Sequence, residues 1–361
     1  MTTMVQRIEP RTNPKEDWEQ AAQWLSENKG WVGSELELST DWHYTATSEE
    51  IAHLEKMVRK VAGLLNNDAN KLPGMSRQNF DLGPFGERLD EIMSQVRDGV
   101  GVALYRSLPL DKFSLLETAI IYWAMGLYIG QPMSNNSEGD MIGHVVDAGE
   151  DYNDPRQRGY QTNATMDYHC DQTDVVTLLC INTAKSGGTS KLSSSVAIYH
   201  ELMRRQPELV EVLREPYCWT KHSEKNDGES NYYESPVFNY KNGRMSTSFG
   251  PHHMIKGHAL PEAPDMTSEQ KTAIDFMHEL AEELHAEMSF KRGDIQFANN
   301  YTVLHAREAF EDWPEPGHRR TLWRLWLAVP NFLPSTPYSE QWRSGVDLSS
   351  VTPRIELVYP G

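Results

Sequence analysis

The chain has 361 residues, a formal net charge of −18 and 39% hydrophobic residues. This length allows one large domain with extensions or two smaller ones, and the acidic charge disfavours nucleic acid as a partner. No segment is apolar over the length of a membrane helix, and the polar N-terminus lacks the apolar stretch of a signal peptide. Three cysteines argue against a disulfide framework and fit a reducing compartment, so we expect a cytoplasmic protein. The lack of a long apolar segment predicts that the protein has no membrane partner.

The first 85 residues are expected to form an irregular arm and then a helical extension. A capping box at Thr47–Glu50 precedes apolar residues at helical spacing as far as Leu65. Further helices are predicted over residues 87–97 and 114–128, and a short apolar strand over residues 99–105 lies between them.

Short strands dominate the rest of the chain. They are predicted over residues 175–181, 190–195, 237–240, 244–249, 287–290, 295–298 and 322–329. Helices are predicted over 197–205, 207–213 and 267–284, with Pro207 ending the first and beginning the second. This order predicts a mainly β fold with flanking helices (α+β), built on a double-sheet jelly roll. We therefore divide the chain into an N-terminal arm and helical extension (1–85), a jelly-roll domain (86–335) and a C-terminal tail (336–361).

Two side chains that can bind a metal lie one residue apart in Tyr168-His169-Cys170-Asp171. In an extended segment His169 and Asp171 share one face, and Cys170 points to the other. An imidazole and a carboxylate are two thirds of the 2-His-1-carboxylate site of non-haem Fe(II) proteins. Such a pair also arises by chance in a chain with thirteen histidines, so the support must come from its neighbours.

Further polar residues gather near the C-terminal strands. His305 follows a Gly-Asp turn and a strand, which suits a ligand at the mouth of a barrel. Strand alternation puts Arg320 and Arg324 on one face, roughly 13 Å apart, if no bulge intervenes. Arginines inside a barrel need anionic partners, because a buried unpaired guanidinium is very costly. A dianionic co-substrate supplies such a partner.

The order of these motifs resembles the TauD/TfdA family of Fe(II)- and 2-oxoglutarate-dependent dioxygenases, which have a double-stranded β-helix core. The resemblance covers roughly residues 90–330 and does not extend to residues 1–85. It rests on H-x-D at 169–171 with the apolar run after it, S-G-G-T-S at 186–190, R-G-D at 292–294, N-N-Y-T-V-L-H-A-R at 299–307 and H-R-R-T-L-W-R-L-W-L at 318–327.

The resemblance implies a ligand for each position of the iron. His169, Asp171 and His305 correspond to the metal ligands, so that 2-oxoglutarate takes two open positions and O₂ the third. Arg320 corresponds to the arginine that binds the distal carboxylate of 2-oxoglutarate. Ser190 stands where the family usually has a threonine whose hydroxyl contacts the co-substrate, and it keeps that hydroxyl.

The resemblance says less about the substrate. Arg324 matches a position that helps to bind an anionic substrate in some members of the family. Tyr233 and Phe238 are candidates to line the substrate pocket, with packing between strands as the alternative interpretation. The segment between His305 and Arg320 is longer than in the family's shorter members, and the additional residues fall in an external turn at 313–317.

Two polar residues near His305 have structural interpretations. We expect Arg307 to pair with Asp312 or Glu311 rather than to take part in catalysis. We also consider Asn300 as a residue that orients His305.

The sequence therefore predicts a dioxygenase that uses Fe(II), 2-oxoglutarate and O₂ to oxidise a C–H bond of a small molecule. Hydroxylation is the default outcome, and desaturation, ring formation and oxidative C–N or C–S cleavage, which use the same oxidant, stay open. A role in secondary metabolism is an analogy. The alternative is a jelly-roll protein without catalysis that only binds a metal or a small ligand. The full triad together with Arg320 favours the enzyme. The substrate and the oligomeric state, including a homo-oligomer, are left open.

Overall fold

The computed structural model describes residues 15–149, 161–221, 229–332, 336–342, 346 and 351–358. Its centre is an antiparallel sheet whose strand order is β1-β2-β14-β6-β17-β3, with β4 also paired to β17 and only β1–β2 parallel. The strands are β1 (His43–Thr45), β2 (Val102–Arg106), β3 (Gln131–Met133), β4 (Gly143–Val145), β6 (Val175–Asn182), β14 (Ile295–Asn299) and β17 (Thr321–Ala328).

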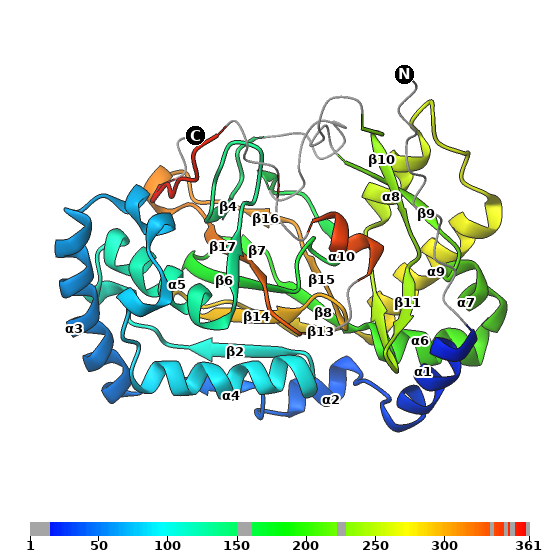
Figure 1. Ribbon diagram of the computed structural model, residues 1–361, viewed down its shortest axis with the longest axis horizontal. Helices are drawn as coiled ribbons and strands as arrows, with labels where there is room; N and C mark the ends of the chain where they lie inside the picture. The colour runs from blue at the N-terminus through cyan, green and yellow to red at the C-terminus, as the bar shows by residue number, and fades with distance from the viewer. Residues whose placement is uncertain are drawn as a thin grey trace, which may run out of the picture.

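A second sheet, ordered β13-β8-β15-β5, completes the jelly roll (Figure 1). Its strands are β5 (Met166–His169), β8 (Ser190–Ser194), β13 (Ala286–Met288) and β15 (Val303–Arg307). Three two-stranded sheets accompany it: β9 (Tyr217–Thr220) with β10 (Tyr232–Ser235), β11 (Phe238–Lys241) with β12 (Arg244–Thr247), and β7 (Ser186–Gly187) with β16 (Phe310–Glu311). The predicted jelly roll with flanking helices is confirmed.

Three helices from the N-terminal half of the chain lie around the large sheet, at the left and below β2 in the view of Figure 1. They are α3 (Ser48–Leu65), α4 (Pro84–Asp98) and α5 (Leu115–Ile129). The predicted capping box begins α3: Thr47 Oγ1 accepts from the Glu50 backbone N–H at 3.2 Å, and the Glu50 carboxylate accepts from that of Thr47 at 2.7 Å. Apolar residues of these helices and of the sheet form one buried cluster.

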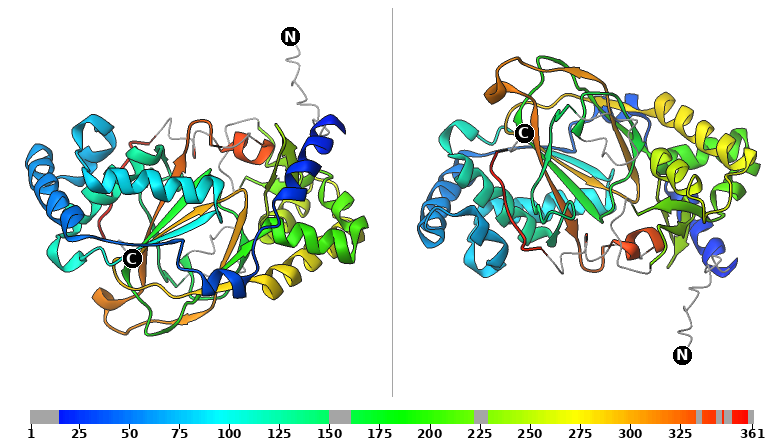
Figure 2. Two further views of the ribbon diagram at one scale, coloured as in Figure 1. Left: turned by 90° about the horizontal axis from the view of Figure 1, so that it is seen from below. Right: turned by 90° about the horizontal axis from the view of Figure 1, so that it is seen from above.

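A second buried cluster lies at the end of the molecule opposite α3, among the helices and hairpins between β8 and β13 (Figure 2). Its helices include α6 (Ser195–Arg205), α7 (Pro207–Leu213), α8 (Pro251–His258) and α9 (Ser268–Leu284); the short α10 (Pro337–Gln341) lies against β10. The predicted Asn-Gly hairpin joins β11 to β12, and both Asn242 and Gly243 have positive φ, as a type I′ turn requires.

The structure differs from the sequence-based prediction in residues 1–47, of which 1–14 lie outside the described residues. Two helices, α1 (Lys15–Glu27) and α2 (Gly33–Leu38), and strand β1 occur where an irregular arm was expected. Packing explains the difference, because Ala21 and Leu25 of α1 are buried in the second cluster and α2 packs on β13. The boundaries at 85/86 and 335/336 stay predictions. No helix in the described ranges combines the length and the apolar character needed to cross a bilayer.

Candidate active site

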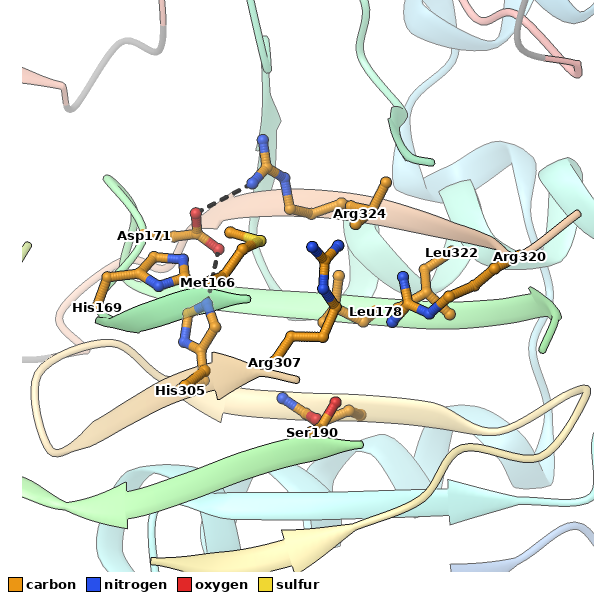
Figure 3. A pocket seen from close by; sticks show the side chains of 13 residues that line it. Met166, His169, Asp171, Leu178, Ser190, His305, Arg307, Arg320, Leu322 and Arg324 are labelled. Carbon is orange, nitrogen blue, oxygen red and sulfur yellow. Dashed lines mark hydrogen bonds and ion pairs between the residues drawn. The ribbon is translucent and has the colours of Figure 1, made fainter. Parts of the chain in front are cut away.

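Strand pairing brings the two predicted histidine ligands together. β15 pairs with β5 so that His305 lies opposite His169, and their ring centroids are 4.3 Å apart. Asp171 follows two residues after His169, just beyond the end of β5. One potential ligand atom from each of the three side chains lies within 4.8 Å of the others. The structure therefore groups these residues as the sequence predicted, at one end of a cavity inside the jelly roll (Figure 3).

Hydrogen bonds hold the His169 ring and the backbone at Asp171 in positions that suit a metal. His169 Nδ1 is 2.8 Å from the carbonyl oxygen of Asp167, so this nitrogen carries the proton and Nε2 is the one available for a metal. The backbone N–H of Asp171 donates to Asn300 Oδ1 at 3.1 Å. Asn300 thus positions Asp171, whereas the sequence suggested that it would orient His305.

The protonation states also suit metal binding. Burial, with a further contribution from His305, lowers the pKa of His169 to about 4, so the imidazole is neutral at pH 7. Burial alone would raise the pKa of the Asp171 carboxyl. The Arg324 guanidinium and His305 outweigh it and hold that pKa well below its usual range. The group therefore offers a neutral imidazole and a carboxylate, the forms in which these side chains bind metals.

Cys170 points away from this site, as strand alternation predicted. Its side chain is buried in the same apolar cluster as Tyr168, and its Sγ lies 3.6 Å from the carbonyl oxygen of Thr247. Burial raises the pKa of the thiol to about 12, so it stays protonated at neutral pH. Packing, and not redox chemistry, accounts for this residue.

The opposite end of the cavity holds a buried positive charge. Arg320 lies directly before β17, is 4% exposed and extends over the ring of Phe310, with its guanidinium carbon 5.0 Å from the ring centroid. Its backbone N–H donates to Asp312 at 2.6 Å, but its Nη1 has no hydrogen-bond partner in the described part of the chain. Burial lowers the pKa of Arg320 to about 10, so the side chain remains cationic at pH 7. Ser190, on β8, lines the same cavity.

A second arginine lies beside the predicted metal ligands. Arg324 Nη1 is 3.1 Å from Asp171 Oδ1, and its Nε donates to Asn135 Oδ1 at 2.9 Å. The guanidinium carbon also lies 4.5 Å from the ring centroid of Trp326. Arg320 and Arg324 both line the cavity, so the predicted common face is confirmed. The register shift in the β17–β6 pairing, between Thr321 and Leu322, does not turn Arg320 away.

The structure corrects one of the two aromatic assignments. Phe238 has no exposed surface and packs in the second cluster, where its ring centroid is 5.3 Å from that of Tyr199. Packing between strands, the alternative interpretation, is therefore right for Phe238, and its assignment to the substrate pocket is wrong. Tyr233 stacks near Trp219 and accepts a hydrogen bond from Trp342 Nε1 at 3.1 Å, so its role toward a substrate stays a prediction.

Two polar residues in the cavity were missed. Arg307 follows His305 by two positions on β15 and therefore points to the same side. Among the described residues it bonds the carbonyl oxygens of Thr162 and Ala164, not Glu311 or Asp312, which corrects the expected ion pair. Glu311 pairs with Lys185 instead. Strand alternation from His305 could have located Arg307.

The second missed residue is Gln296 of β14, which also lines the cavity and is 1% exposed. Its strand was predicted, but nothing in the local sequence distinguishes the face toward the cavity from the face toward the helices.

Two histidines and a carboxylate inside a jelly roll, with a buried cation deeper in the same cavity, define the class of non-haem iron oxygenases that take an anionic co-substrate. The family model of the taurine catabolism dioxygenase TauD, TfdA family matches residues 68–326. The chain belongs to this family of Fe(II)- and 2-oxoglutarate-dependent dioxygenases. It is therefore an enzyme that uses Fe(II), 2-oxoglutarate and O₂.

Two curated proteins are similar over most of the chain. FR-33289 synthase of Streptomyces rubellomurinus is 26% identical over 307 residues, which are 83% of this chain and 89% of that protein. The taurine hydroxylase-like protein SAT17 of Stachybotrys chartarum is 25% identical over 312 residues, or 83% and 79% of the two chains.

Solved structures share the fold. Asparagine oxygenase in complex with Fe(II), 2S,3S-3-hydroxyasparagine and succinate superposes with a TM-score of 0.61 at 15% identity, covering 80% of this chain and 93% of that chain. The non-haem iron oxygenase OrfP in complex with Fe and alpha-ketoglutaric acid gives 0.60 at 15% identity, covering 86% and 98%.

Cys170 offers a test of the local geometry. We expect Cys170→Ala to bind Fe(II) as tightly as the wild type, because the thiol faces the apolar cluster and not the metal. Anaerobic Fe(II) titration followed by metal analysis measures this, with circular dichroism to verify folding. Loss of iron from a folded Cys170→Ala protein would mean that the sulfur contributes to the metal site.

Proposed function

We propose that His169, Asp171 and His305 hold Fe(II), and that Arg320 and Ser190 hold the distal carboxylate of 2-oxoglutarate in the same cavity. The observation that carries this proposal is the buried Arg320 guanidinium, whose Nη1 has no partner in the described ranges. A buried cation in that condition is costly unless an anion joins it. Figure 3 shows Arg320 at the end of the cavity opposite the three ligands.

Charge balance supports this placement. Two positive charges from iron, one negative charge from Asp171 and two from 2-oxoglutarate leave one negative charge, which Arg320 cancels. The planar guanidinium matches a carboxylate with two parallel hydrogen bonds, and the Ser190 hydroxyl adds a third donor. When bound, iron and 2-oxoglutarate supply the activation of O₂, with succinate and CO₂ as co-products.

The other residues of the site position these groups. Asn300 fixes the backbone at Asp171, and Asp167 fixes the His169 ring through its carbonyl. Arg324 fixes the Asp171 carboxylate from the side opposite His305, whose Nε2 lies 3.5 Å from Oδ2. The metal ligands are thus held in place before substrate arrives, which lowers the reorganisation needed for catalysis.

The substrate in this proposal is a small molecule of secondary metabolism with an anionic group near Arg324. Support for a small molecule comes from the similar proteins, a synthase and a hydroxylase-like protein, and from neighbours that bind hydroxyasparagine or (3S)-hydroxy-L-Arg. Hydroxylation of a C–H bond is the proposed outcome. The alternative is that the Arg324 guanidinium serves only to pair with Asp171, and replacement of Arg324 by glutamine distinguishes the two roles.

A cytoplasmic location remains part of the proposal. Its support is that Cys170, Cys180 and Cys218 are all buried free thiols, as a reducing compartment permits.

Turnover is expected to require the three proposed ligands. His169→Ala should abolish succinate formation from 2-oxoglutarate, because the two remaining ligands, Asp171 and His305, are not sufficient to hold iron in the cavity. Removal of iron by a chelator should do the same to the wild type, and added Fe(II) should restore it. Succinate formation that persists in a folded His169→Ala protein would contradict the assignment.

Arg320→Ala is expected to weaken 2-oxoglutarate far more than iron. Removing one partner of a buried ion pair costs about 3–5 kcal/mol, or roughly two to three orders of magnitude in Kd. Anaerobic titration of the Fe(II) enzyme, followed by the absorption of the chelate, measures the affinity. Arg319→Ala is the matched control, since Arg319 is the exposed neighbour and should leave Kd unchanged. An unchanged affinity in Arg320→Ala would remove the residue from the co-substrate site.

Arg324→Gln is expected to affect substrate and not 2-oxoglutarate. At saturating Fe(II), the chelate absorption should form as in the wild type, and candidate anionic substrates should no longer perturb it. Loss of the chelate absorption itself would assign Arg324 to the co-substrate. A substrate response like that of the wild type would leave Arg324 as a partner of Asp171 only.

A further inference from the structure

The least explained polar group in the cavity is the side chain of Gln296. It lies on β14 between two leucines, paired with Leu104 of β2 on one side and Leu178 of β6 on the other. The residue is 1% exposed, and its Oε1 has no hydrogen-bond partner within the described residues. It lines the same cavity as Ser190 and Arg320.

Packing does not explain an amide at this position. A buried amide without a partner is unfavourable, and a leucine of similar volume would avoid that cost beside two leucine neighbours. Buried polar atoms are almost always satisfied in native proteins, so an unsatisfied amide at a cavity wall points to a bound polar group. Rotation of the terminal amide by 180° exchanges its oxygen and its N–H₂, so the group that faces the cavity can be the donor. Here the wall already carries Arg320 and Ser190, whose donors also face the cavity.

We propose that Gln296 is a further co-substrate-binding residue, whose amide N–H₂ donates to the distal carboxylate of 2-oxoglutarate. Its Oε1 then accepts from a guanidinium N–H of Arg320 that does not face the carboxylate, since Arg320 lines the same cavity and the single Ser190 hydroxyl proton is committed to the co-substrate. The inference rests on the proposed placement of 2-oxoglutarate between the three metal ligands and Arg320.

The neutrality of the amide is what suits it to this place. Arg307, Arg320 and Arg324 already line the cavity as cations, so a further cation would add to an excess of buried positive charge. A carboxylate can accept about four hydrogen bonds, and one guanidinium with one hydroxyl leaves part of that capacity unused. Gln296 adds a donor without adding charge.

Gln296→Leu tests the proposal in the full-length Fe(II) enzyme. Anaerobic titration with 2-oxoglutarate, followed by the chelate absorption, should show a Kd raised by about 10- to 100-fold, as expected for a lost hydrogen bond to a charged group. Fe(II) binding should be unchanged. The melting temperature without 2-oxoglutarate should not fall, because an unsatisfied buried amide is replaced by an apolar group.

Ser193→Ala is the matched control. Ser193 lies on β8 and is fully buried, its Oγ also has no partner in the described part of the chain, and it does not line the cavity. Its replacement should leave the affinity for 2-oxoglutarate unchanged. If Gln296→Leu does not fold, Gln296→Asn keeps the amide but shortens its reach, and it should also raise Kd.

A second ligand locates the contact. 2-Oxopentanoate keeps the oxo acid group that chelates iron and lacks the distal carboxylate. The ratio of Kd between Gln296→Leu and wild type should be large for 2-oxoglutarate and close to one for 2-oxopentanoate. An equal ratio for both ligands would place the contact at the oxo acid end, and an unchanged Kd for 2-oxoglutarate would remove Gln296 from the site. Failure of the wild type to bind 2-oxoglutarate would instead contradict the proposed function.

Discussion

The antiparallel register of β15 against β5 is the constraint on which the site depends. It sets His305 opposite His169, and it leaves Asp171 just past the end of the strand, within reach of both. A slip of one residue would turn every side chain of β15 to the other face and remove His305 from the cavity. β8 secures the register from the other side, because it pairs with β15 over five residues, from Val303 to Arg307.

Electrostatic complementarity extends this constraint through the cavity. Asp171 is the one carboxylate among the cavity-lining residues of the described ranges, and Arg324 and His305 approach it from two sides. Arg307 and Arg320 give the inner part of the cavity a positive potential. The protein as a whole carries a charge of −18, so these cations in the cavity contrast with the acidic chain and suit the anionic co-substrate.

Local patterns in the sequence predicted those parts of the site that depend on alternation or on motif order. His169, Asp171 and Cys170 lie on the faces that a strand period predicts, and the motif order placed His305 and Arg320. Helix α1 was missed, because burial of its apolar face against a distant hairpin stabilises it. Phe238 and Gln296 show a related limit. The strands that carry them were predicted, but which face of each strand meets the core and which meets the cavity depends on how the sheets pack.

The two arginines of β17 restrict how relatives of this enzyme can differ in length. The exposed turn before the strand, which includes the 3-10 helix Pro316–His318, can gain or lose residues without moving either guanidinium. A single residue inserted between Arg320 and Arg324 would turn one of them out of the cavity, and two would keep the face but shift it by about 7 Å. Insertions before Arg320 are therefore expected to leave the cavity intact, whereas insertions between Arg320 and Arg324 are expected to disrupt it, so the two arginines act as one spaced unit.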